Sequence, residues 1–363
     1  MAVRQLVEGR RERQISEIDE ELRKMIEKRK TQIKVVGCGG AGNNAISRLM
    51  QVGIVGAQTI AINTDAMDLL YTDADVKILI GKELTGGLGA GADPKIGMEA
   101  SKESKEEIKK ALKGADMVFI TAGLGGGTGT GSAPVVAEVA KKMGALTIAI
   151  VTMPFSMEGK QRWDNARWGL EMLESVVDTL IVIPNDKLLE LVPDLSVASA
   201  FKIADEILVN AVKGITEMIT KPGLVNRDFA DVKSIMSESG LAMIGLGESD
   251  SENRAVESVM KALNNPLITV DISNAKGALI SITSGPDITM KEAHQILETV
   301  KSKLSEDAKI IWGIQIDKSL GETVRTMLVI TGVSSPQIYG AGKTPSKQYK
   351  KSIEKALNIE FIG

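Results

Sequence analysis

The glycine-rich stretch Leu124–Gly131 constrains the fold of this chain more than any other part of the sequence. It lies between the apolar run Met117–Ile120 and the helical pattern Ala133–Ala140. Glycine permits positive φ and lets a ligand approach the backbone closely, because it has no Cβ. Free N–H groups and the dipole at a helix N-terminus attract an anion. The order strand, glycine loop, helix therefore predicts a phosphate-binding loop rather than a linker.

A second unit of the same kind begins at the apolar run Ile33–Val36. Gly37, Gly39 and Gly42 have the G-x-G-x-x-G spacing of dinucleotide-binding proteins, and Asp65 follows about where a ribose-binding acid would lie. Alone, this pattern favours NAD. The loop at Leu124–Gly131 argues against NAD, because a dinucleotide crevice does not require a second Gly/Thr loop two strands later.

Strands and helices alternate through the first half of the chain with short connections. This alternation predicts an α/β fold with a doubly wound parallel sheet, in which ligands bind at the carboxyl ends of the strands. Both glycine loops, Asn63–Asp65 and Glu158 follow expected strands, so we expect them at one edge of the sheet. The glycine-rich segment Thr85–Ala92 is expected to close on the ligand, and a helix from about Pro94 to Lys113 is expected after it.

The second half contains one long apolar helix and a smaller domain. Ser196–Ile219 has a broad apolar side, which predicts burial between two bodies. Beyond it, shorter strands and helices without glycine loops predict an α/β or α+β domain. The expected organisation is a charged helical extension (1–30), a nucleotide-binding domain (31–195), a central helix (196–222), an activation-loop and C-terminal domain (223–332) and a flexible tail (333–363).

Composition excludes several classes of function. A net charge of −3 gives no electrostatic footprint for nucleic acid. The longest apolar runs are strand-length, so no membrane-spanning segment is expected. Cys38 and His294 are the single cysteine and histidine, which disfavours zinc and excludes an internal disulfide. A single cysteine also fits a cytoplasmic setting.

The phosphates must be held without a P-loop lysine. Gly340–Thr344 ends like a Walker A loop, but Gln337 stands where the first glycine is required. Backbone N–H groups, helix N-termini and a metal ion remain as phosphate ligands. Mg²⁺ bound through nucleotide phosphates needs few protein carboxylates, so no dedicated set of protein metal ligands is expected.

The loop Gly125–Gly131 resembles the signature loop of the tubulin and FtsZ superfamily, in the form typical of FtsZ, and the resemblance covers roughly residues 31–332. It implies GTP and GDP as ligands, with Mg²⁺ held mainly through the phosphates. It also implies phosphate contacts from both glycine loops, ribose contacts from Glu158 and Arg162, and guanine contacts from Asn185 and Asp205. The implied nucleotide-binding residues are Gly39, Gly40, Ala41, Gly42, Asn43, Asn44, Asp65, Gly126, Gly127, Thr128, Gly129, Glu158, Arg162, Asn185 and Asp205.

Without the resemblance, several residues of the candidate site have simpler interpretations. Glu158 and Arg162 have the i,i+4 spacing of a surface ion pair. Asn185 equally fits a helix cap. Asp228 and Asp231, three residues apart, can project on one face at a helix start, and Asp228 alone fits an N-cap.

The resemblance gives Asp228 and Asp231 a catalytic role. By it, Asn226–Asp231 is the loop that one subunit inserts into the nucleotide site of the next, where the carboxylates orient and polarise the attacking water. Hydrolysis would then occur only in a filament. The resemblance implies a filament-forming GTPase of cell division, located in the cytoplasm at the division site, with a membrane-tethering partner. The acidic and apolar recognition peptide of bacterial members is not visible in Asn358–Gly363. By the resemblance, this difference is an archaeal-like feature.

Two alternatives from other classes stay open at this point. An NAD-binding oxidoreductase built on Gly37–Gly42 would need a catalytic acid or base, and the sequence offers only His294, far from the glycine loops. A structural polymer or nucleotide-binding module that has lost turnover is the other alternative, and the presence of Asp228 and Asp231 argues against it.

Overall fold

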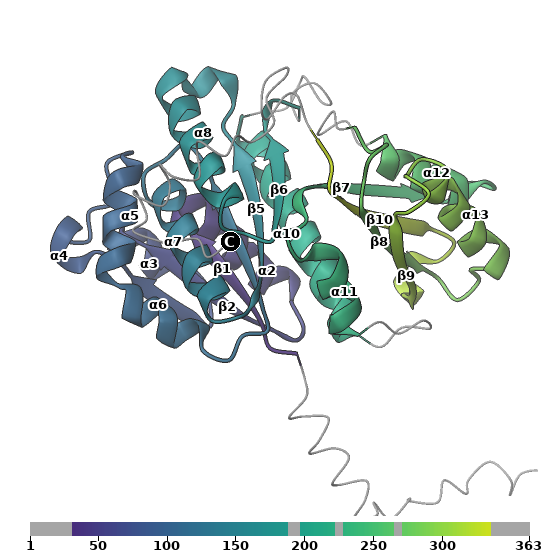
Figure 1. Cartoon of the computed structure of the whole chain (residues 1–363), viewed down its shortest axis with the longest axis horizontal. Coiled ribbons are helices and arrows are strands. Elements are labelled where there is room, and N and C mark those ends of the chain that lie inside the picture. Colours follow the sequence, from purple (N-terminus) through teal and green to yellow (C-terminus); the bar gives the residue numbers. More distant parts are fainter. Residues whose placement is uncertain (1–30, 188–196, 222–227, 265–270, 335–363) are drawn as a thin grey trace, which may run out of the picture. The chain divides into compact units, whose positions relative to one another are not determined.

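The structure, a computed structural model, describes residues 31–187, 197–221, 228–264 and 271–334 (Figure 1). By their contacts, Met1–Thr31 and Gln32–Gly363 form two separate units. The described helices and strands belong to the second unit. The predicted N-terminal helix and almost all of the predicted tail lie outside the described residues.

A mixed sheet runs through the whole second unit. Within the described ranges it has ten strands in the order β3-β2-β1-β4-β5-β6-β7-β10-β8-β9. Its parallel part consists of β1 (Ile33–Cys38), β2 (Ala57–Asn63), β3 (Val76–Leu79), β4 (Met117–Gly123), β5 (Leu146–Met153) and β6 (Thr179–Pro184). These strands confirm the predicted doubly wound parallel sheet.

The other strands form the mixed part of the sheet. They are β7 (Gly240–Ser249), β8 (Gly277–Ser284), β9 (Lys309–Ile316) and β10 (Val324–Thr331). β10 is antiparallel to β7 and β8, whereas β9 is parallel to β8. A short parallel pairing of β6 with β7, from Thr179↔Gly240 to Ile181↔Ala242, joins the two parts. The sequence did not predict this continuity.

Helices cover both faces of the sheet. Successive residues of a strand point to opposite faces of the sheet and so belong to two different cores. Val35 and Phe119 lie in one core, and Val36 and Ile120 lie in the other. The first core includes residues of α2 (Gly39–Val52), α10 (Val197–Thr220) and α11 (Phe229–Met236). The second includes residues of α5 (Pro94–Glu103), α6 (Lys105–Leu112), α7 (Thr128–Lys142), α8 (Lys160–Glu174), α12 (Arg254–Leu263) and α13 (Met290–Lys301). Apolar strands covered on both faces are typical of parallel sheets.

The long helix α10 contacts both parts of the sheet (Figure 1). Leu208, Val212 and Ile215 are at most 2% exposed, and the helix packs against α2 and β5. On its other side Gly214 lies so close to β10 that an added Cβ would be 2.3 Å from Sδ of Met327. The predicted burial of this helix is confirmed.

One predicted helix is wrong. The pattern from Pro94 to Lys113 predicted a single helix, but the structure divides it into α5 and α6 at Ser104, whose φ of −95° and ψ of 18° are not helical. The Ser104 hydroxyl instead accepts a hydrogen bond from Gly81 N at 3.1 Å. This bond ties the helix break to the segment after β3.

Candidate nucleotide-binding site

Helices α2, α3 (Ala66–Tyr71), α5 and α7 are among those that begin at the carboxyl ends of the parallel strands or in the loops that follow them. The first turns of α2, α7 and α5 approach backbone to backbone: a Cβ on Gly39 would lie 2.6 Å from Gly129 N, and one on Gly131 would lie 2.0 Å from Pro94 O. Gly39 also has a φ of +70°. Because only glycine permits this packing, several free N–H groups and helix dipoles converge, as an anion site requires.

The signature loop joins β4 to α7. Gly125, at φ +109°, donates its N–H to Thr130 Oγ1 at 2.9 Å. Thr128 Oγ1 lies 2.6 Å from Thr64 Oγ1 and so links this loop to the segment after β2. Gly126 faces open space, since an added Cβ there would meet nothing within 4 Å. Gly127 instead packs tightly, because its Cβ would lie 2.8 Å from Ala90 Cβ.

A carboxylate that sequence reasoning missed lies beside the first glycine loop. Asp68 Oδ2 accepts hydrogen bonds from Asn63 Nδ2 at 2.6 Å and from Asn43 Nδ2 at 3.2 Å. Asn43 is 1% exposed, and its Oδ1 has no hydrogen-bond partner among the described residues. Gly40, Ala41 and Asn44 are exposed. The loop therefore offers a buried acceptor beside an open backbone.

Asp65 has a structural role within the chain. It caps α3 through Oδ1, which accepts from Met67 N at 2.9 Å and from Asp68 N at 3.1 Å. This cap fixes the start of α3 beside the glycine loops.

Glu158 and Arg162 form the predicted ion pair, with 2.9 Å between Oε2 and Nη1. They do not share a helix. Glu158 ends the 3-10 turn η1 (Ser156–Glu158), and Arg162 lies in α8 beyond Gly159, which has a φ of +96°. Because Glu158 Oε1 also accepts from Phe155 N at 2.8 Å, the pair is fixed to the end of β5.

Two polar side chains and an aromatic ring lie near the ends of β5 and β6. Asn185 is 4% exposed, and its Oδ1 has no partner within the described part of the chain. Burial raises the pKa of Asp205, on α10, to about 6. Phe201, one turn before Asp205, is 42% exposed and meets Phe155 edge to face at 5.0 Å between ring centroids. Sequence reasoning did not assign Phe201 to the site. The signal that could have found it is the rarity of aromatic residues, which make up only 3% of the chain.

Asp228 and Asp231 lie on α11, apart from the glycine loops of the same chain. Asp228 caps α11, with Oδ1 accepting from Asp231 N at 2.8 Å, and both carboxylates are exposed. The helix is anchored at the amino end of β6, where Thr179 Oγ1 donates to Met236 O at 2.5 Å. The glycine loops lie at the carboxyl ends of the strands. One chain therefore does not bring the two groups together.

A cation missed by sequence reasoning lies near Asp231. Lys309 Nζ donates to Ser234 Oγ at 2.6 Å, and Ser234 Oγ donates to the Asp231 carbonyl at 2.6 Å.

Within the described ranges, no three carboxylate, histidine or cysteine side chains gather to hold a metal ion. No helix in the same ranges is both long and apolar enough to cross a bilayer.

A cavity of about 590 Å³ lies elsewhere, between α10 and the mixed part of the sheet. Lys213, Glu217, Gln315 and Arg325 contribute to its lining. No residue of the glycine loops lines it, so it is separate from these loops.

Fold and site together define an α/β protein that binds a phosphorylated nucleotide. Two family models match the chain: "Tubulin/FtsZ family, GTPase domain" over residues 32–193 and "FtsZ family, C-terminal domain" over residues 240–334. Cell division protein FtsZ 1 of Thermococcus kodakarensis is 64% identical over 334 residues, which cover 92% of this chain and 89% of that protein. Cell division protein FtsZ of Methanothermobacter thermautotrophicus is 57% identical over 354 residues, which cover 96% and 93%.

A solved structure of an FtsZ dimer from M. jannaschii superposes with a TM-score of 0.83 at 58% identity, covering 91% of this chain and 100% of that one. The chain therefore belongs to the FtsZ family and carries its GTPase domain. An NAD-binding oxidoreductase is not supported, because the segment Gly37–Gly42 lies within the match to the GTPase domain.

Proposed function

We propose that this chain is a GTP-hydrolysing cytoskeletal protein that polymerises into filaments for cell division. The observation that carries the proposal is the separation of two incomplete half-sites. Converging helix N-termini offer free N–H groups to a phosphate, and two exposed carboxylates lie at the start of α11, toward the opposite edge of the sheet. The names of the relatives support cell division, and the M. jannaschii FtsZ described as a dimer supports self-association.

The nucleotide is assigned to the strand ends. The phosphates bind to Gly39–Asn44 and Gly126–Gly129, with Asp65 at the nucleotide site beside them, and the ribose binds to Glu158 and Arg162. Mg²⁺, held mainly through the phosphates, neutralises part of their charge. The exposed backbone of Gly40 and Ala41 and the open space at Gly126 support this placement.

The guanine is assigned to Asn185 and Asp205. The unpartnered, buried Asn185 Oδ1 requires a donor, and the Asp205 carboxylate accepts from N–H groups of the base. Phe201 offers an exposed aromatic face one turn from Asp205. An aromatic face suits a purine ring.

Hydrolysis is assigned to a site shared by two subunits. Asp228 and Asp231 of one subunit enter the nucleotide site of the next and polarise the attacking water there. The Asp228 cap uses Oδ1, which leaves its other oxygen for this role. Lys309, whose ammonium donates to Ser234 of the same helix, adds a positive charge beside α11.

The remaining assignments follow the family. Residues 31–195 form the nucleotide-binding domain, 196–222 the central helix and 223–332 the activation-loop and C-terminal domain, with 1–30 and 333–363 as extensions. The protein acts in the cytoplasm at the division site, where a tethering protein links its filaments to the membrane.

The test combines sedimentation with phosphate release over a range of protein concentrations, using GTP, ATP and NAD side by side. Pelleting and phosphate release that appear together with GTP support the proposal. Turnover of NAD, or GTP hydrolysis without any pelleted polymer, contradicts it.

A further inference from the structure

Asn165, in the second turn of α8, joins two loops that are distant in the sequence. Its Nδ2 donates to the carbonyl of Ala92 at 3.0 Å and to the carbonyl of Gly125 at 3.2 Å. The side-chain amide has two N–H donors, so each donor can serve one carbonyl. Asn165 therefore links the Gly86–Asp93 loop to the signature loop.

Both tied segments lead directly into phosphate-binding helix N-termini. Ala92 precedes Asp93, the N-cap of α5, and Gly125 lies two residues before Gly127, the N-cap of α7. The two N-termini also touch, because a Cβ on Gly127 would lie 2.9 Å from Asp93 N. Asn165 thus adds a hydrogen-bonded link between two groups of N–H donors that also pack against each other directly.

At this end the Gly86–Asp93 loop is held by an internal hydrogen bond, Asp93 N to Ala90 O at 3.0 Å, and by the external bond from Asn165. Ala92 has a φ of +60°, which is unfavourable for a residue with a Cβ. Such a conformation persists only where the surroundings fix it. The other end of the loop is held by backbone hydrogen bonds, Ala66 N to Gly87 O at 3.0 Å and Gly89 N to Thr64 O at 3.3 Å.

We propose that Asn165 is a positioning residue that latches the Gly86–Asp93 loop onto the signature loop and so sets the rate at which nucleotide leaves. The inference rests on the proposed function, since it assumes guanine nucleotide at these loops. Without the latch, the carboxyl half of the loop can move away from α7, and the phosphates lose the N–H groups at the start of α5.

The first test measures release of a fluorescent GDP from dilute, unassembled protein. Asn165→Ala should release it roughly tenfold faster, as the loss of two hydrogen bonds implies. Asn165→Asp should have a larger effect, because a carboxylate repels both carbonyl oxygens. Asp164→Ala, an exposed neighbour on the same helix, is the matched control and should release GDP at the wild-type rate. Alanine favours the helix, so the Asn165→Ala protein should fold.

The second test measures hydrogen–deuterium exchange without nucleotide. Exchange in residues 86–93 should speed up in Asn165→Ala and stay unchanged in Asp164→Ala, whereas a merely structural role would speed exchange throughout α8. Wild-type release and wild-type loop exchange in Asn165→Ala would overturn the latch. A wild-type protein that binds no guanine nucleotide would overturn the proposed function, and the exchange measurement keeps that failure distinct because it needs no nucleotide.

Discussion

Two adjacent glycines of the signature loop have different surroundings, and their substitutions should therefore differ. Gly126→Val adds a side chain only to open space, where the phosphates are assigned. We expect it to weaken GTP binding more than tenfold and to leave the melting temperature of nucleotide-free protein unchanged. Titration with GTP and thermal denaturation measure the two quantities.

Gly127→Val is the matched comparison. A Cβ there would lie 2.8 Å from Ala90 Cβ and 2.9 Å from Asp93 N, so overpacking should cost about 1–3 kcal/mol of stability. Any loss of GTP binding in this variant is then partly structural. A Gly126→Val protein with normal GTP affinity would remove this loop from the site.

The Asp205 carboxylate should make GTP binding pH-dependent. Burial raises its pKa from 3.8 to about 6, and its protonated form cannot accept from both N–H groups of guanine. GTP affinity should therefore fall as the pH decreases from 7 to 5, whereas ATP affinity should not. Asp205→Asn should bind GTP weakly at every pH. An unchanged pH profile in Asp205→Asn would place the base elsewhere.

The same shift has the opposite effect on stability. Because the folded pKa lies above the unfolded one, protonation of Asp205 favours folding below pH 3.8, and this contribution is lost as the pH rises through about 6. Nucleotide-free Asp205→Asn protein should consequently melt at a higher temperature than wild type at pH 7. Lower stability together with weaker binding would indicate a structural carboxylate.

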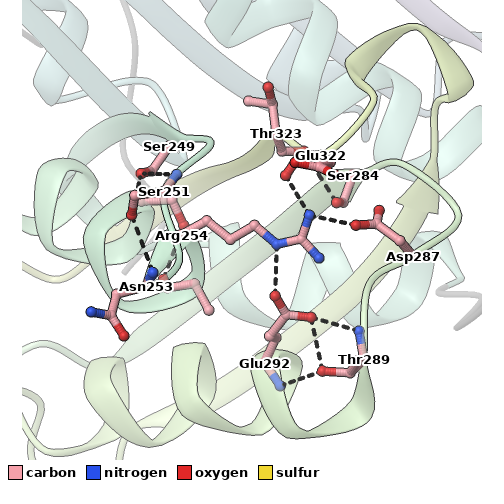
Figure 2. A network of polar contacts seen from close by, with 12 residues as sticks. Ser249, Ser251, Asn253, Arg254, Ser284, Asp287, Thr289, Glu292, Glu322 and Thr323 are labelled. Carbon is pink, nitrogen blue, oxygen red and sulfur yellow. Dashed lines mark hydrogen bonds and ion pairs between the residues drawn. The ribbon is translucent and has the colours of Figure 1, made fainter.

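At the scale of elements, one guanidinium holds together three segments of the mixed part of the sheet (Figure 2). Arg254, at the start of α12, donates to Glu292 of α13 at 2.7 Å, to Asp287 after β8 at 2.6 Å, and to the Glu322 carbonyl before β10. Glu292 also completes a capping box with Thr289. The Arg254 side chain is 11% exposed and that of Glu292 20%, so solvent screens this pair less than the pair with Asp287, whose side chain is 45% exposed.

Glu292→Gln should destabilise this part of the molecule in a pH-dependent way. Hydrogen bonds, mainly from Arg254, lower the pKa of Glu292 from 4.5 to about 2. The stabilisation is thus complete above pH 4.5 and is lost as the pH falls toward 2. We expect a loss of about 1–3 kcal/mol at pH 7, shrinking in acid. Glu298→Gln, on the same helix, is the control, and equal effects of the two changes would contradict the assignment.

At the scale of the whole molecule, GTPase activity should depend on protein concentration. The 24 residues of α10 extend about 36 Å. Asp228 and Asp231 follow the end of this helix in the sequence, whereas the proposed guanine site lies near its start. We therefore expect that one subunit cannot use its own acids. Activity per molecule should be near zero in dilute protein and rise sharply when filaments form.

Asp231→Ala should separate assembly from hydrolysis. The variant should bind GTP and form polymer, which persists because phosphate is not lost, and mixing it with wild type should reduce activity at each mixed junction. The side chain that caps α11 is that of Asp228, so the Asp231→Ala change leaves the cap in place. Phosphate release and sedimentation measure both properties. Normal turnover in Asp231→Ala, or activity that is independent of concentration, would exclude a shared site.

The sequence by itself determined the features that depend on neighbouring residues. Apolar runs before the glycine loops predicted β1 and β4, and short connections predicted the parallel sheet, because strand order and handedness follow from local connectivity. The edge at which Gly39–Asn44, Asn63–Asp65 and Gly126–Gly129 meet followed from the same reasoning. The apolar side of α10 likewise predicted its burial.

Only the tertiary structure decided which side chains meet across long sequence separations. The β6–β7 pairing, the bonds of Asn165 to Ala92 and Gly125, and the position of Lys309 near Asp231 join residues with no local pattern. The break at Ser104 has the same cause, since it depends on a bond to Gly81. A sequence pattern reports propensity and periodicity, whereas these contacts depend on the packing of whole elements.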